Sequence, residues 1–156
     1  MTVECFLDTN ILLYAASRNP AHLLKKTRAI ELIEEKQFAL SAQVLQEFYV
    51  NVTKKADFSL KPEVAIQWIE NLEEFVCLPI DSGLVKTAAA VSVRYGISYW
   101  DGAVIAAAEA LGAPILYTED LNHGQAYGTV TAINPFLDLL AQPGFHENEQ
   151  TALAKD

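Results

Sequence analysis

The sequence has few cysteines and no long apolar run. Its 156 residues include two cysteines, Cys5 and Cys77, whose spacing fits no metal-ligand pattern. Both lie in short apolar runs, which favours buried free thiols. No apolar run approaches the roughly 20 residues that span a bilayer, and the N-terminus has no basic-then-apolar signal segment. We therefore expect a globular cytoplasmic protein with no membrane partner.

Glycine and basic residues are also scarce. No glycine-rich turn follows the first apolar run, which excludes P-loop and dinucleotide-binding folds. The chain has 11 Lys and Arg against 20 Asp and Glu, and residues 95–156 contain eight acids and one base. Phosphate binding needs cations, so a nucleic-acid partner would require bound divalent metals. A basic protein segment, in contrast, could dock directly on the acidic half.

Short apolar runs alternate with helical patterns along the chain, and the length indicates one domain. Strand-like runs lie at 3–7, 38–40, 75–80, 113–120 and 129–135. Helical patterns lie at 10–17, 22–36, 41–55, 62–75, 81–95 and about 100–112. Lys25 and Lys26 are expected on the wet side of the second helix. This alternation predicts an α/β fold with a parallel sheet covered on both faces over residues 1–142, followed by a mobile tail at 143–156.

The segment ECFLDTNILLYA, residues 4–15, carries an apolar run directly into Asp8. Asp8, Thr9 and Asn10 all cap helices well, so an ordinary strand-to-helix turn is one interpretation. The other interpretation is a site, because ligands of α/β proteins lie beyond the carboxyl ends of parallel strands.

Three more acids occupy comparable positions. Asp101, in the first turn of a mostly apolar helix, is expected on a buried face, where a charge needs a partner or the helix dipole. Asp120 follows an apolar strand within LYTEDLNHG, and Glu47 flanks the apolar stripe of its helix. Taken alone, Asp120 fits a solvated turn and Glu47 a solvated helix face.

Together these acids predict a metal site. In a doubly wound sheet all four can converge on one crevice. Four clustered carboxylates repel one another unless cations are bound, and hard oxygen ligands select Mg²⁺ or Mn²⁺. Two divalent ions would cancel the four charges and let the site accept an anionic phosphate.

The blocks FLDTNILLY, QVLQEFY, ISYWDGAVIAAA and LYTEDLNHG resemble, in order and spacing, the PIN-domain nucleases, particularly the VapC-type toxins of prokaryotic toxin–antitoxin pairs. The resemblance spans about residues 3–141 and implies a PIN-like fold, with a five-stranded parallel sheet between helices. It implies an acidic quartet of Asp8, Glu47, Asp101 and Asp120. It also implies three supporting polar contacts, Thr9, Asn10 and Thr118. Glu119 remains an alternative to Asp120 as the fourth acid.

The resemblance also implies an activity and partners. Asp8 and Asp101 would hold an Mg²⁺ or Mn²⁺ ion that activates water to hydrolyse an RNA phosphodiester, making the protein an endoribonuclease. Glu47 and Asp120 would complete the metal shells. Many members of the family dimerise, and the toxins are held inactive by an antitoxin whose C-terminal segment enters the acidic groove. A homodimer and an antitoxin with a basic segment are therefore expected.

Side chains outside the quartet are assigned lesser roles. The histidines, His22, His123 and His146, lie in expected loops or the tail and are predicted to be solvated. Trp100 is expected in the core, although Tyr99 and Trp100 could stack an unpaired base.

Three alternatives compete with a nuclease. A phosphatase of the haloacid-dehalogenase type needs a second Asp where this chain has Asn10, and a response-regulator receiver needs a late-strand Lys that residues 114–118, PILYT, do not supply. A catalytically silent PIN fold acting as a protein-binding scaffold stays open, although the intact quartet speaks against it. Phosphate mimics would label Asp8 covalently in a receiver or dehalogenase but not in a metal nuclease.

Overall fold

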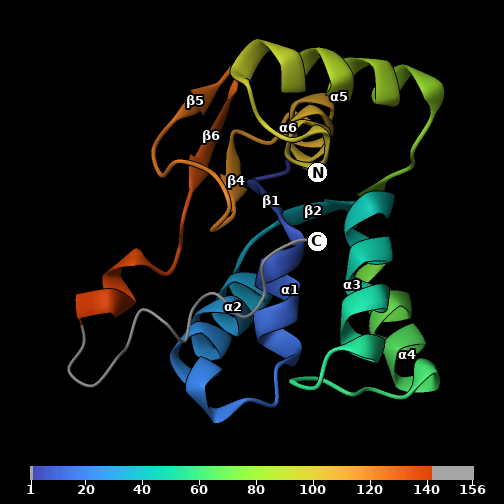
Figure 1. Cartoon of the computed structure of the whole chain (residues 1–156), viewed down its shortest axis with the longest axis vertical. Helices are drawn as coiled ribbons and strands as arrows, with labels where there is room; N and C mark the ends of the chain where they lie inside the picture. The colour runs from blue at the N-terminus through green and yellow to red at the C-terminus, as the bar shows by residue number, and fades with distance from the viewer. Residues whose placement is uncertain (1, 142–156) are drawn as a thin grey trace.

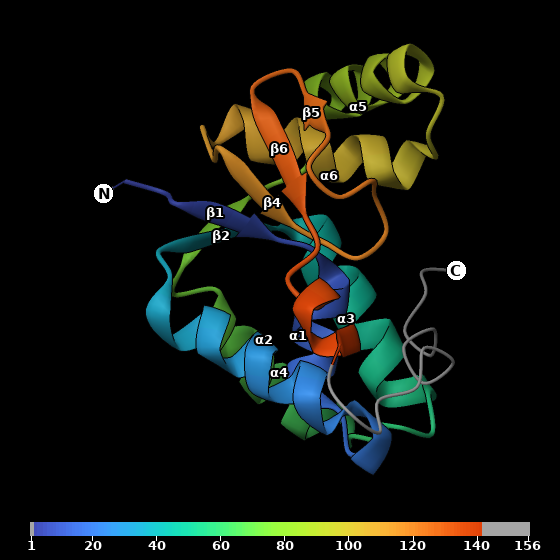
Figure 2. The ribbon, with the colours of Figure 1, turned by 90° about the vertical axis from the view of Figure 1, so that its left-hand side faces the viewer.

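The computed structural model describes residues 2–141, so the tail expected at 143–156, including His146, lies outside the described residues. A central sheet separates two groups of helices (Figures 1 and 2). The helices are α1 (Thr9–Ala16), α2 (Leu23–Glu35), α3 (Ala42–Lys54), α4 (Pro62–Leu72), α5 (Ser82–Tyr95) and α6 (Tyr99–Ala110). Two short 3₁₀ turns, Pro20–His22 and Leu137–Ala141, complete the helical structure.

The sheet has the strand order β3-β2-β1-β4-β6-β5. Its strands are β1 (Cys5–Leu7), β2 (Phe38–Ser41), β3 (Val76–Leu78), β4 (Ile115–Tyr117), β5 (Ala126–Tyr127) and β6 (Val130–Ile133). The first five strands in this order are parallel, as predicted, and β5 is an antiparallel edge strand that the sequence did not reveal. Two residues before the turn at Gly128, whose φ is 64°, are too few to produce a recognisable alternation.

Helices α1–α4 lie on one side of the sheet and α5 and α6 on the other (Figures 1 and 2). Capping residues set several helix starts: the side chains of Ser41, Asp81 and Ser98 accept hydrogen bonds from backbone N–H groups of α3, α5 and α6. Helix α5 ends at Gly96 in the left-handed conformation. The helix boundaries predicted from periodicity are therefore confirmed to within a few residues.

Helix α6 is buried and α5 covers its outer side. Residues 102–108 of α6 are all buried, whereas Ala88 is the one buried residue of α5 among the residues described. Gly102 permits the close approach, since a Cβ there would lie 2.7 Å from the backbone oxygen of Ala88. Val93, 83% exposed, shows how open the outer face of α5 is.

Three predicted environments are wrong. Lys25, expected in solvent, is 1% exposed, because α2 presents it to acceptors on distant elements that periodicity cannot reveal. His22, also expected in solvent, is buried, with its Nδ1 2.7 Å from the Ser17 hydroxyl and its ring edge-on to Tyr14. Trp100, expected in the core, is 55% exposed because it lies at the start of α6, beyond the sheet. In the described chain no helix is long and apolar enough to cross a bilayer.

Candidate active site

The carboxyl ends of β1, β2 and β4 meet at one edge of the sheet. Leu7 and Tyr117, the last residues of β1 and β4, are paired in register. The chain remains paired one step further, where the backbone N–H of Asp8 donates to the carbonyl of Tyr117 at 3.1 Å. The residues that follow these strands, Asp8 and Thr118, are thereby held side by side.

Asp8 is buried in a polar network at this edge. Its Oδ1 accepts from the backbone N–H of Thr9 at 2.7 Å, and its Oδ2 accepts from the hydroxyl of Thr118 at 2.8 Å. The Thr118 oxygen accepts from the backbone N–H of Asp120 at 3.1 Å and lies 3.5 Å from Nδ2 of Asn10. One buried hydroxyl therefore connects the Asp8 carboxylate to the backbone of Asp120 and to the side-chain amide of Asn10.

Glu47 enters this network from α3. Its Oε2 accepts from the Thr9 hydroxyl at 3.1 Å, and its Oε1 accepts from Nε2 of Gln43 at 2.7 Å. Glu47 is half-buried, at the rim rather than on a fully solvated face. Ser41 caps α3 and sets the register that points Gln43 and Glu47, one turn apart, in the same direction.

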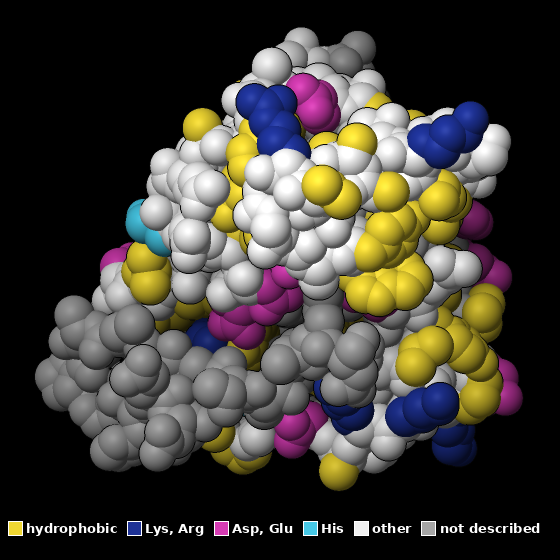
Figure 3. Space-filling view, turned by 45° about the horizontal axis from the view of Figure 1, so that its top comes forward, with side chains coloured by type: hydrophobic (Ala, Val, Ile, Leu, Met, Phe, Trp, Pro, Cys, Tyr) yellow, Lys and Arg dark blue, Asp and Glu magenta, His cyan; other side chains and the backbone are white. Residues whose placement is uncertain are grey.

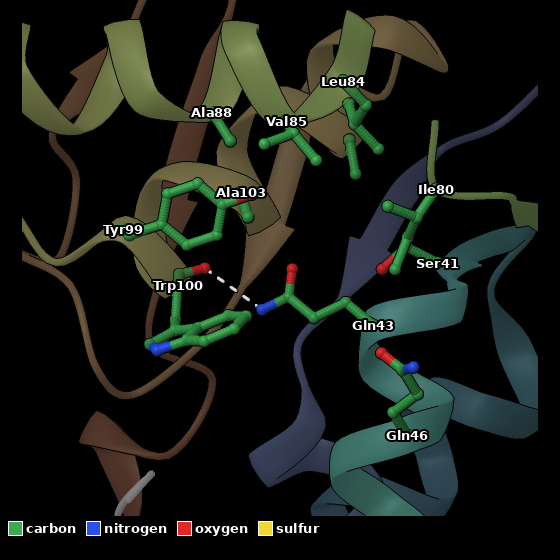
Figure 4. Close-up of a pocket in the computed structure, with 11 residues that line it drawn as sticks. Ser41, Gln43, Gln46, Ile80, Leu84, Val85, Ala88, Tyr99, Trp100 and Ala103 are labelled. Atoms are coloured by element: carbon green, nitrogen blue, oxygen red, sulfur yellow. Dashed lines mark hydrogen bonds between the residues drawn. The ribbon is translucent and has the colours of Figure 1, made fainter. Parts of the chain in front are cut away.

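Gln43 connects α3 to the start of α6, where Asp101 lies. The Gln43 amide also donates to the carbonyl of Trp100 at 3.2 Å, next to Asp101 in the chain (Figure 4). The backbone N–H of Asp101 donates to the Ser98 cap at 3.0 Å, and its side chain is half-buried rather than fully buried as expected. The structure thus links the carboxylates of Asp8 and Glu47 through Thr9, and it links the backbone of Asp120 to Asp8 through Thr118. Asp101 lies in the first turn of α6, next to Trp100.

Glu119, the alternative fourth acid, faces a separate set of partners. The hydroxyl of Tyr14 donates to its Oε1 at 2.7 Å, and the ammonium of Lys25 donates to its Oε2 at 2.8 Å. Burial and the Glu119 charge raise the pKa of Tyr14, and burial lowers the pKa of Lys25. Sequence reasoning missed Tyr14, Lys25 and Gln43, since each acts through a partner distant in sequence or on another helix.

An apolar pocket of about 220 Å³ lies beside the network, between α3 and the α5–α6 pair (Figure 4). Its polar side is formed by Gln43 and Gln46, its aromatic side by Tyr99 and Trp100, and its aliphatic side mainly by α5. Acidic side chains gather near the middle of the face shown in Figure 3, with hydrophobic side chains beside them. This face combines negative charge with exposed apolar surface.

The donor atoms at the sheet edge fit a hard divalent cation. They are carboxylate, hydroxyl and amide oxygens, the ligands that Mg²⁺ and Mn²⁺ prefer. Asn10 Oδ1 is buried and has no hydrogen-bond partner within the described residues, so it is an oxygen donor with unused capacity. Between residues 2 and 141, no group of three His, Cys, Asp or Glu side chains is close enough to share an ion. A metal at this edge would therefore take only some of its ligands from carboxylates and the others from neutral oxygens such as Asn10 Oδ1.

Solved structures with this fold include toxin–antitoxin proteins. A toxin of Mycobacterium tuberculosis, VapC20, described as cleaving the sarcin–ricin loop, matches with a TM-score of 0.62 and 20% identity over 75% of this chain and 90% of that chain. A toxin–antitoxin complex from Klebsiella pneumoniae matches with a TM-score of 0.63 and 19% identity over 85% and 98%. VapBC2 from Rickettsia felis, bound to a promoter DNA fragment, matches with a TM-score of 0.57 and 16% identity over 85% and 98%.

Sequence comparison gives the family directly. No curated protein sequence matches the chain. The family model of the PIN domain matches residues 5–128, which include all four predicted acids. The chain therefore belongs to the PIN-domain family.

Proposed function

We propose that this chain is a cytoplasmic, Mg²⁺- or Mn²⁺-dependent endoribonuclease and the toxin of a toxin–antitoxin pair. The observation that carries the proposal is the network at the carboxyl edge of the sheet. There the Thr118 hydroxyl donates to the Asp8 carboxylate, the Thr9 hydroxyl donates to the Glu47 carboxylate, and the backbone N–H of Asp120 donates to the Thr118 oxygen. Membership of the PIN-domain family and the fold shared with a sarcin–ricin loop cleaving toxin support RNA as the substrate.

Each acid has a role in this proposal. Asp8 and Asp101 would hold the metal, with Asn10 Oδ1 as a neutral oxygen near them. A bound divalent ion lowers the pKa of water toward neutrality and offsets negative charge at a scissile phosphate. Glu47 and Asp120 would complete the set of oxygen ligands. The two threonines orient the carboxylates of Glu47 and Asp8, since the Thr9 hydroxyl donates to the first and the Thr118 hydroxyl to the second.

The partners follow from charge and exposed apolar surface. The acidic half of the chain fits an antitoxin with a basic segment, and one structure with the same fold is a toxin–antitoxin complex. The exposed outer face of α5, where Val93 is 83% exposed, fits a homodimer contact. A scaffold without catalysis is the alternative, favoured by the same apolar face.

RNA cleavage by site variants tests the proposal. Purified protein is incubated with RNA and Mg²⁺ or Mn²⁺, and products are followed with and without a chelator. We expect Asp8→Asn and Asp101→Asn to lose cleavage by at least about 100-fold, as removal of a transition-state contact does. Glu109→Gln is the matched control, since Glu109 is an exposed acid on the same helix as Asp101, about 12 Å further along. Unchanged cleavage by Asp8→Asn or Asp101→Asn would refute the site.

A further inference from the structure

Outside the acidic quartet, the side chains of Tyr14, Lys25 and Glu119 form a closed cycle of contacts next to Asp120. Lys25 Nζ lies 2.9 Å from the hydroxyl oxygen of Tyr14 and 2.8 Å from Oε2 of Glu119, and the Tyr14 hydroxyl donates to the other oxygen of Glu119 at 2.7 Å. The ammonium also lies over the rings of Tyr14 and Phe136, at 4.6 and 5.3 Å from their centroids. A lysine that is 1% exposed is therefore surrounded by partners.

This cycle engages both carboxylate oxygens of Glu119. The Glu119 side chain is 13% exposed, so reorienting it to another partner would break two charge-assisted hydrogen bonds, one of which is also an ion pair. Glu119 therefore acts as an anchor within the protein, and the neighbouring Asp120 is the more exposed of the two acids.

The anchor lies in a segment that has no regular secondary structure of its own. Strand β4 ends at Tyr117, and residues 118–120 belong to neither helix nor strand. Backbone and side chains both hold this segment. The Thr118 N–H donates to the carbonyl of Ile133 at 3.0 Å and the Thr118 hydroxyl donates to Asp8. Glu119 is bound by the cycle, and the Asp120 N–H donates to the Thr118 oxygen. The position of Asp120 therefore depends on the two residues before it, Thr118 and Glu119.

We propose that Lys25 is a positioning residue that, through Glu119, fixes Asp120 beside Asp8 as the fourth acid of the metal site. This inference rests on the proposed function for the role of the site, but it concerns the placement of one ligand rather than the reaction. Lys25 acts by holding Glu119 in this cycle, so that Asp120 rather than Glu119 serves the metal.

Binding of Mn²⁺ to the apo protein, measured by titration calorimetry, tests the proposal without relying on cleavage. Lys25→Met keeps the length of the apolar stem and removes the ammonium. We expect Mn²⁺ affinity to fall about tenfold, the lower end of the effect of losing a partner that orients metal ligands. Lys26→Met is the matched control, because Lys26 is the next residue on α2 and donates to the carbonyl of Ser17 at 2.8 Å. That variant should bind Mn²⁺ within twofold of the wild type.

Two further variants test the route through Glu119. Glu119→Gln alone should weaken Mn²⁺ binding no more than Lys25→Met, and the double variant should bind no more weakly than Lys25→Met, because both changes remove the same anchor. Tyr14→Phe keeps the ion pair and should weaken Mn²⁺ binding several-fold. It replaces Lys25→Met as the test if that variant does not fold.

The outcomes separate the two proposals. A folded Lys25→Met or Tyr14→Phe with wild-type Mn²⁺ affinity overturns the positioning role, as does a double variant whose losses add. A Glu119→Gln variant that loses Mn²⁺ binding as completely as Asp8→Asn would make Glu119 a ligand instead. Wild-type protein that binds Mn²⁺ but cleaves no RNA overturns only the proposed function, and protein that binds no Mn²⁺ overturns both.

Discussion

Gly102→Ala tests the close packing of α5 on α6, which supports the helix that carries Asp101. An alanine Cβ at this position would lie 2.7 Å from the backbone oxygen of Ala88 and 3.0 Å from the backbone nitrogen of Ser92. Both atoms belong to the backbone of α5, so no side-chain rotation relieves the contact and the whole helix has to move outward.

The expected effect is the difference between two opposing free energies. Overpacking of this kind costs about 1–3 kcal/mol, whereas replacing Gly by Ala inside a helix gains up to about 1 kcal/mol. We therefore expect the free energy of unfolding to fall by about 1–2 kcal/mol, or roughly 2–8 °C in Tm for a domain of this size. Urea unfolding followed by circular dichroism measures this change directly.

Gly83→Ala provides the matched control. Gly83 lies in the first turn of α5, where an added Cβ meets only the side-chain oxygen of Asp81, at 3.3 Å. That variant should be unchanged or stabilised by up to about 1 kcal/mol. If Gly102→Ala proves as stable as the wild type, the two helices are not packed as closely as described, and the support given to Asp101 is wrong.

Three other measurements probe the charged and buried groups. Burial raises the pKa of Cys5 from 9.0 to about 11. The folding stability that this shift contributes is complete below pH 9 and is lost as the pH rises toward 11. Over this range the wild type should lose up to about 2–3 kcal/mol more of its free energy of unfolding than Cys5→Ala. Lys25→Met should cost about 3–5 kcal/mol in urea unfolding, because it leaves the buried Glu119 without its cation, and adding Glu119→Gln should restore most of it. A basic antitoxin segment should bind far more weakly at high salt, and salt-independent binding measured by calorimetry would exclude docking on the acidic half.

The regular elements were predictable because local rules determine them. Short stretches of sequence are enough to recognise the caps at Ser41, Asp81 and Ser98 and the alternation of strands with helices. The helix boundaries and the parallel sheet could therefore be predicted. The edge strand β5 was missed because two residues carry no period. Its pairing depends on the turn at Gly128 and on β6.

The surroundings of individual side chains were harder to predict, since they depend on contacts between distant residues. Lys25 looks like a solvent-facing lysine until α2 is placed against Glu119, 94 residues away. His22 and Trp100 exchanged the environments expected for them, one becoming buried and the other exposed. The resemblance named Thr9 and Thr118 as supporting contacts, but the carboxylate that each hydroxyl binds, and the Gln43 amide between Glu47 and Trp100, became visible only in the three-dimensional arrangement.

The most direct test of the central claim is thermal unfolding with and without millimolar Mg²⁺ or Mn²⁺, for the wild type, Asp101→Asn and Glu109→Gln. A ligand that binds only the folded state stabilises it by about 2.7 kcal/mol at 100 times its Kd. We predict that metal raises the Tm of the wild type and of Glu109→Gln, and that Asp101→Asn loses this rise while its apo form melts no lower than the apo wild type. A metal effect that is absent, or equal in all three proteins, would contradict a shared metal site.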